Sequence, residues 1–163
     1  MATTYTPIAT TTLASAAASY TFSSISGSYT DLILVANAQT TTSQDALRAQ
    51  FNSDTGTNYS YTQLYASTSA ASNRGTSQTG VRILNGATNS GSEYGIGTTH
   101  FLNYSNTTTY KSSLTRTNSN YIASSFVGLW RSTAAITSIT IYPESGGNIL
   151  TGSSFTLYGI KAA

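Results

Sequence analysis

The only histidine of the chain, His100, is the first residue to consider as a catalytic group. Serine catalysis of the Ser-His-acid type needs a histidine that a carboxylate orients and a hydroxyl within hydrogen-bond reach. His100 lies in the run TTHFLNY, and in an extended strand its side chain would share a face with Ile96 and Leu102. This apolar face favours a core or interface histidine, so the sequence predicts no catalytic triad.

Acidic side chains are few and far apart along the chain. There are five: Asp31, Asp45, Asp54, Glu93 and Glu144. Hydrolysis of a glycosidic bond needs two carboxylates roughly 5–10 Å apart, whereas acids are common at strand ends because their side chains suit turns. The chain also has no cysteine, which removes thiolate chemistry and cysteine metal ligands. We therefore expect neither an enzyme nor a bound cofactor.

One short stretch has the alternating oxygen ligands that calcium prefers. Asn52, Asp54 and Asn58 occupy alternate positions of the stretch together with the permissive Gly56. The stretch lacks the closing acid of a twelve-residue calcium loop, and Asp and Gly also serve tight turns. A simple turn is the favoured interpretation, and a metal at residues 52–58 stays open.

A group of aromatic and polar residues could recognise a sugar or a protein partner. In the expected strand at residues 59–66, three tyrosines and a glutamine fall on one face, which could be core or a binding surface. The only tryptophan alternates with Val127 and Leu129, so we expect it to be a packing anchor, with an exposed ligand platform as the alternative. The candidate contact residues are Tyr59, Tyr61, Tyr65, Gln63, Asn73, Arg74 and Trp130.

Composition supports a binding or structural role more than a chemical one. The 163 residues include 30 Thr, 26 Ser and 12 Tyr, and only 7% are charged. The seven basic residues are scattered, so the net charge of +2 gives no basic patch for nucleic acid, and we expect no such partner. No run approaches the ~20 apolar residues of a membrane-spanning helix, and no basic stretch precedes an apolar run. We expect no membrane insertion and no export signal.

Short β-branched and aromatic runs separated by Gly, Ser, Asn and Asp predict an all-β, antiparallel sandwich of jelly-roll type. Residues 31–39 carry apolar side chains on both faces, as in a central strand that is covered on both sides. Residues 47–51 alternate, which predicts a half-buried strand with Arg48 and Gln50 facing water. Further strands are expected at residues 59–66, 81–84, 95–104, 110–116, 125–131, 138–142 and 154–160.

Two stretches lack the bulky residues that a core requires. Residues 1–19 are small and polar, which predicts an extended N-terminal arm that a neighbouring molecule would order, followed by a single sandwich domain at residues 20–163. Residues 67–78 have no apolar residue larger than Ala, which predicts a long exposed loop.

Three stretches together resemble a known group of proteins. They are YTPIATTTLASAAASYTFSSISGSYTDLILV at residues 5–35, FNSDTGTNYSYTQLY at residues 51–65 and VGLWRSTAAITSITIYPESGGNILTGSSFTLYGI at residues 127–160. They resemble Ser/Thr-rich β-sandwich virion proteins of tailed bacteriophages, common in marine and cyanobacterial phages, which serve in head decoration, tail or fibre positions. The resemblance spans nearly the whole chain and carries no catalytic signature, so it implies a family rather than a role for any residue.

The resemblance implies a virion structural protein made in the host cytoplasm. Our leading expectation is a decoration (cement) subunit on the outer capsid surface, which contacts other virion proteins and associates with its own copies, with a trimer favoured. The alternative is a tail- or fibre-associated receptor-binding module that recognises a host surface glycan. Sequence alone leaves capsid and tail positions open.

Overall fold

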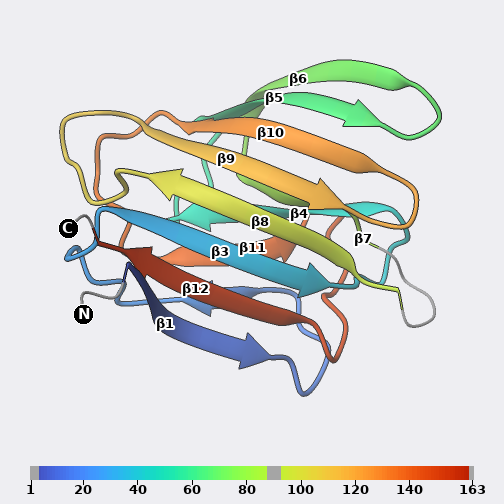
Figure 1. Cartoon of the computed structure of the whole chain (residues 1–163), viewed down its shortest axis with the longest axis horizontal. Helices are drawn as coiled ribbons and strands as arrows, with labels where there is room; N and C mark the ends of the chain where they lie inside the picture. The colour runs from blue at the N-terminus through green and yellow to red at the C-terminus, as the bar shows by residue number, and fades with distance from the viewer. Residues whose placement is uncertain (1–3, 88–92, 162–163) are drawn as a thin grey trace.

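The chain folds into two antiparallel β-sheets that face each other (Figure 1). The structure is a computed structural model, and it describes residues 4–87 and 93–161. These residues form no helix, and so none that could span a membrane. The all-β prediction is confirmed, and the architecture is consistent with a β-sandwich.

The eight-stranded sheet has the order β1-β12-β3-β8-β9-β10-β5-β6, and the four-stranded sheet has the order β2-β11-β4-β7. The strands of the first are β1 (Tyr5–Thr12), β12 (Ser154–Ile160), β3 (Asp31–Ala38), β8 (Gly95–Leu102), β9 (Lys111–Asn118), β10 (Ala123–Trp130), β5 (Tyr59–Ala66) and β6 (Ala70–Gln78). The strands of the second are β2 (Tyr20–Phe22), β11 (Ile139–Pro143), β4 (Asp45–Phe51) and β7 (Val81–Ala87).

The hydrophobic core fills the space between the two sheets. Alternate residues of β3 and β12, such as Leu34 and Leu157, point inward and are fully buried. The ring of Phe51 lies 5.4 Å from the rings of both Phe101 and Trp130, measured between centroids, and joins the sheets at one end of the core. Because each fully buried side chain of this size contributes about 1.5–3 kcal/mol, this layer is the main source of stability.

Strand β3 has the expected central position, but only one of its faces is covered. It lies between β12 and β8, and its inward residues Leu32 and Leu34 are fully buried. Its outward residues Ile33 and Val35 are only partly buried, because no strand of the described chain crosses the outer surface of the eight-stranded sheet (Figure 1). The prediction of cover on both sides is therefore not met within one copy of the chain.

The N-terminal segment is extended, and it belongs to the chain's own sheet. β1 pairs antiparallel with β12 from Tyr5 opposite Ile160 to Thr12 opposite Ser154. Main-chain hydrogen bonds do not require bulky side chains, so a small-residue segment can add a strand. The partly buried side chains of Ile8 and Leu13 then pack against the core. Within the arm expected at residues 1–19, Tyr5–Thr12 therefore forms an edge strand of the chain's own sheet.

The prediction of a loop at residues 67–78 is wrong, because Ala70–Gln78 forms the edge strand β6. It pairs antiparallel with β5 from Ala66 opposite Ala70 to Tyr59 opposite Gln78. Nearly all of its side chains are exposed on both faces, so no apolar alternation marks the strand in the sequence.

Candidate functional site

His100 lies on the outer surface of the eight-stranded sheet, next to an acid from the neighbouring strand. Its Nε2 is 3.0 Å from Oδ2 of Asp31, while Oδ1 of Asp31 accepts a hydrogen bond from the Asn103 amide. Within the described residues, no serine or threonine hydroxyl hydrogen-bonds to the imidazole. The hydrogen bond between His100 and Asp31 links β8 to β3. Nucleophilic catalysis would also need a hydroxyl bonded to the imidazole, and the described residues supply none.

The Asn52–Asn58 stretch forms a turn that its own side chains hold closed. Oδ1 of Asp54 accepts hydrogen bonds from the Gly56 amide and from Nδ2 of Asn58, and Oδ2 accepts one of 2.7 Å from Nε1 of Trp130. The bond from Trp130 is the main reason that the pKa of Asp54 lies below its usual value, although partial burial acts in the other direction.

These contacts fit a turn better than a calcium site. Both oxygens of Asp54 receive N–H donors, and Asn52 points elsewhere, toward Ala135 and Thr137. Over residues 4–87 and 93–161, no three acidic or histidine side chains gather as a metal would need. The turn interpretation therefore has direct support from the hydrogen bonds.

Four of the candidate contact residues face the interior of the sandwich. Tyr59 is fully buried and its ring stacks on Trp130, whose indole is also in the core, with 6.1 Å between centroids. Tyr61 packs edge-on against Phe126. The fourth, Gln63, is buried too and donates its side-chain amide to the Ser124 hydroxyl. A sugar stacks on an exposed ring face, and these three rings offer none.

Close approach of β6 contributes to this burial. A Cβ added at Gly75 would lie 2.5 Å from Cε1 of Tyr61, so only glycine at this position lets the ring lie against β6. From the other side, the guanidinium of Arg82 lies 4.8 Å from the Tyr61 ring centroid. The tyrosine is thus held between an edge strand and a cation.

The remaining candidates lie at the surface. Asn73 and Arg74 are exposed on β6, opposite Gln63 and Thr62 of β5, and Asn73 accepts a hydrogen bond from the Arg74 amide. Tyr65 is half-buried on β5 and lines a shallow groove. The structure therefore divides the seven candidates between core and surface, and it does not bring them together as one site.

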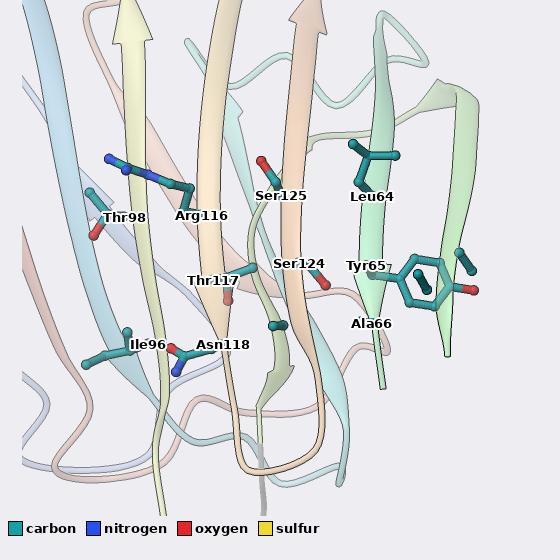
Figure 2. A pocket seen from close by; sticks show the side chains of 13 residues that line it. Leu64, Tyr65, Ala66, Ile96, Thr98, Arg116, Thr117, Asn118, Ser124 and Ser125 are labelled. Atoms are coloured by element: carbon teal, nitrogen blue, oxygen red, sulfur yellow. The ribbon is translucent and has the colours of Figure 1, made fainter. Parts of the chain in front are cut away.

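The groove lies over β5, β6, β8, β9 and β10 and has a volume of about 700 Å³ (Figure 2). Its lining combines apolar residues with free polar groups, among which Arg116 and Asn118 point outward from β9. The lining residues are Leu64, Tyr65, Ala66, Ala70, Ala71, Ile96, Thr98, Arg116, Thr117, Asn118, Ala123, Ser124 and Ser125. Of these lining residues, the sequence analysis named only Tyr65 as a candidate. Its other candidates on β5, namely Tyr59, Tyr61 and Gln63, lie on the inward face of that strand.

The groove is part of a wider apolar surface, which we call the outer apolar face. We define it by five large side chains that are between 41% and 64% exposed: Leu64, Ile96, Leu102, Leu114 and Val127. They come from four strands that lie next to one another in the eight-stranded sheet, β8, β9, β10 and β5. Leu114 and Val127 are direct cross-strand partners. In Figure 1 this face points toward the viewer.

The cationic side chains of the four-stranded sheet are in ion pairs rather than in water. Glu144 accepts hydrogen bonds from the guanidinium groups of both Arg48 and Arg82. Arg48 is 8% exposed, so the prediction that it faces water is wrong, because Glu144 and Gln78 cover it. Burial alone would raise the pKa of Glu144, but the bonds from Arg82 and Arg48 outweigh it and hold that pKa below its usual value.

Lys111 is a further buried cation, and its side chain links two loops by hydrogen bonds. It is 2% exposed, and its Nζ donates to the main-chain oxygens of Thr109 and Thr133. Burial lowers the pKa of this amine. These two carbonyl groups explain why the amine is buried at this place, and no bound ligand is needed to explain it.

Comparison with known proteins gives no family for the chain. A scan against protein-family models finds no match, and a search of the curated proteins finds none either.

Proposed function

We propose that this chain is a structural protein of a tailed-phage virion, a decoration (cement) subunit on the outer capsid surface that acts through protein–protein contacts. The resemblance of residues 5–35, 51–65 and 127–160 supports the virion setting. The observation that carries the contact role is the outer apolar face. The proposal assigns the chain no catalytic step and no cofactor.

The outer apolar face supports adhesion because soluble monomers rarely expose large contiguous apolar patches, and larger ones mark interaction sites. Here Leu64 and Val127 are 64% and 58% exposed, while the core side chains behind them are fully buried. Such a surface gains free energy when a partner removes it from water, at roughly 25 cal/mol per Å² of apolar area.

Basic residues are in the wrong places for a nucleic-acid partner. Arg48 and Arg82 bond to Glu144, and Lys111 is buried. The four others are spread over the sequence: Arg74, Arg116, Arg131 and Lys161. Binding to phosphates relies on clustered basic groups, so we propose protein partners.

The proposed partners are other virion proteins and further copies of this chain, with a trimer as the arrangement expected from the sequence. The chain would be made in the host cytoplasm and reside on the virion surface. The fold that accompanies this proposal is a jelly-roll-like sandwich. In support, each strand of the four-stranded sheet, β2, β4, β7 and β11, is preceded and followed in the chain by a strand of the eight-stranded sheet, so that the described chain crosses between the sheets eight times.

The experiment is a cryo-EM reconstruction of the virion, combined with quantitative mass spectrometry of its proteins. Decoration requires density for this chain at many copies on the outer capsid lattice. A few copies confined to the tail would contradict decoration, and absence from the purified virion would contradict the virion setting altogether.

The groove supports a second candidate, a tail- or fibre-associated module that binds a host surface glycan. A ring stacks on a sugar face, and amide and guanidinium groups pair with hydroxyls. Tyr65, Arg116 and Asn118 line the groove, and no hydrogen bond within the described chain uses the side chains of Arg116 and Asn118. Tyr61 and Trp130 are buried, so the groove residues are the ones to vary.

A glycan array tests this candidate. Binding that disappears in Tyr65→Ala and in Asn118→Ala, with the fold intact, would favour the receptor-binding role. Unchanged binding in both variants would exclude the groove as the site.

A further inference from the structure

We propose that the outer apolar face is covered by the same face of a second copy of this chain, which gives a two-fold symmetric dimer. This inference deepens the proposed function and rests on it, since it names one partner of the adhesive surface. Four observations carry it: an apolar row across the sheet, the pattern of β3, the area of the sheet's outer surface and the small number of charges on it.

An almost unbroken apolar row crosses the middle of the face. The register places five outward-facing residues side by side on adjacent strands, from β12 to β10: Tyr158, Ile33, His100, Leu114 and Val127. Leu64, Ile96 and Leu102 flank this row. A row at right angles to the strands is the ridge that the side chains of a second sheet pack against.

Strand β3 has the sequence of a strand that is buried on both sides. Its residues DLILVANA place Leu32 and Leu34 inward and Ile33 and Val35 outward. Strands with one solvated face normally alternate apolar and polar residues, whereas doubly covered strands read as continuous apolar runs. One copy of the chain covers only the inner side, and a second copy supplies the missing cover.

The outer surface of the whole eight-stranded sheet is about as large as the surface that each partner buries in a stable dimer. Eight strands spaced ~4.8 Å apart, each about eight residues long at ~3.3 Å per residue, span about 900 Å². A standard protein interface buries about 800 Å² on each partner. The sheet is therefore large enough to form a stable contact without help from other surfaces.

The charge on the face allows it to meet its own copy. Asp31 and His100 bond to each other, and the other charged groups on the outward side of the strands are Arg116 of β9 and Arg74 of the edge strand β6. An unlike partner would usually be selected by complementary charge, and this face has little charge to complement. Two identical, twisted sheets can instead stack in the aligned geometry of a sandwich, about 10 Å apart.

Face-to-face pairing is isologous, so it closes at two copies. This surface therefore favours a dimer over the trimer expected from the sequence. The groove, with Leu64 and Ile96 at its sides, would be enclosed between the two copies.

The test is the mass of the full-length chain in solution, by analytical ultracentrifugation over a dilution series. The variant is Leu114→Glu/Val127→Lys. It places opposite charges on direct cross-strand partners, which a sheet tolerates, while the apolar row is lost. The matched control is Thr140→Glu/Thr21→Lys, also cross-strand partners, on the outward side of the four-stranded sheet.

The expected result is a dimer of twice 17.1 kDa for the wild type and the control, and a shift of at least tenfold in the dissociation constant for the variant. A wild-type monomer at high concentration, a trimer, or a dimer that the variant leaves unchanged would overturn the inference. If the charged variant fails to fold, Leu114→Thr/Val127→Thr replaces it, since Thr suits strands.

The outcome is separable from that of the proposed function. A monomeric chain found at many copies on the capsid would overturn the dimer and keep the decoration role. A dimer broken by the variant but absent from virions would keep the pairing and overturn the virion role. A monomer that binds glycans through the groove would overturn the dimer in favour of the receptor-binding candidate.

Discussion

At the scale of single residues, the side chains with the most chemical potential hold the fold together. Asp54 closes a turn and receives the indole N–H of Trp130, and Glu144 joins two arginines. The sequence places acids at turns correctly from their local preferences. It does not indicate their partners, because Trp130 lies 76 residues beyond Asp54 in the chain.

Replacement of Trp130 by Phe tests the first of these contacts. The variant loses the hydrogen bond to the Asp54 carboxylate, and bonds to charged groups contribute about 1.5–3 kcal/mol. We expect the free energy of unfolding to fall by roughly 2 kcal/mol at neutral pH and the pKa of Asp54 to rise toward its usual value. Urea denaturation and an NMR titration of Asp54 measure the two effects.

The pH dependence of this loss has a defined sign. A carboxylate whose folded pKa is depressed stabilises the protein above its unfolded value of 3.8, and this contribution is lost as the pH falls through the folded pKa. The difference between wild type and Trp130→Phe should therefore shrink in acid. An equal difference at neutral pH and at about pH 2 would mean that lost packing, and not the hydrogen bond, explains the variant.

Glu144→Gln tests the second contact. It leaves the guanidinium groups of Arg48 and Arg82, whose side chains are 10% and 17% exposed, without a counter-charge, and a broken buried pair costs about 3–5 kcal/mol. Because the Glu144 side chain is 27% exposed, we expect a loss near the lower end, about 3 kcal/mol. Thermal and urea unfolding measure it.

The control for this variant is Glu93→Gln, because Glu93 is exposed and surface pairs contribute only about 0–1 kcal/mol. The depressed pKa of Glu144 also means that wild-type stability should decline below pH 4.5, and this decline should be smaller in Glu144→Gln. Equal losses in the two glutamine variants would contradict the buried ion pair.

At the scale of elements, strands with bulky residues were predictable and strands without them were not. Alternation located β3, β5 and β12 within a residue or two, because inward side chains must be apolar. The edge strands β1 and β6 consist largely of Thr, Ala and Ser, and a neighbouring backbone, not their side chains, holds them in place. A local pattern cannot show that a distant strand offers this partner.

Removal of residues 1–12 tests the role of β1. The truncated chain loses its pairing with β12 and the partly buried side chain of Ile8, while the rest of the core remains. We expect a folded sandwich whose free energy of unfolding is lower by roughly 2–4 kcal/mol. Circular dichroism and urea denaturation check this, and an unchanged urea midpoint would show that β1 contributes nothing to the isolated chain.

At the scale of the whole molecule, the same alternation that builds the core leaves a second apolar surface outside it. The sequence signalled this through β3, whose outward Ile33 and Val35 have no cover in one copy. The other outward residues, among them Leu114 and Val127, lie on different strands, so the alternation within one strand does not group them into one face. Only the sheet order and register bring them together, which is why the outer apolar face had to be seen in three dimensions.

Salt distinguishes this kind of surface from an electrostatic one. At 1 M salt, interactions between exposed charges more than ~3 Å apart are largely screened. The outer apolar face has few charges, so this screening should affect its contacts little. We expect the dissociation constant of the self-association to change less than threefold between low salt and about 1 M sodium chloride, as measured by sedimentation. Dissociation in moderate salt would mean that ion pairs hold the copies together.

The most direct test of the central claim, that the outer apolar face is the contact surface, is hydroxyl-radical footprinting read by mass spectrometry. Oxidation of the chain in its assembled form is compared with oxidation of the dissociated chain. We predict that Leu64, Leu114 and Val127, which are exposed in the single chain, become protected on assembly, while Tyr142 on the four-stranded sheet keeps its reactivity. Protection of Tyr142 with full oxidation of the three outer residues would contradict the account.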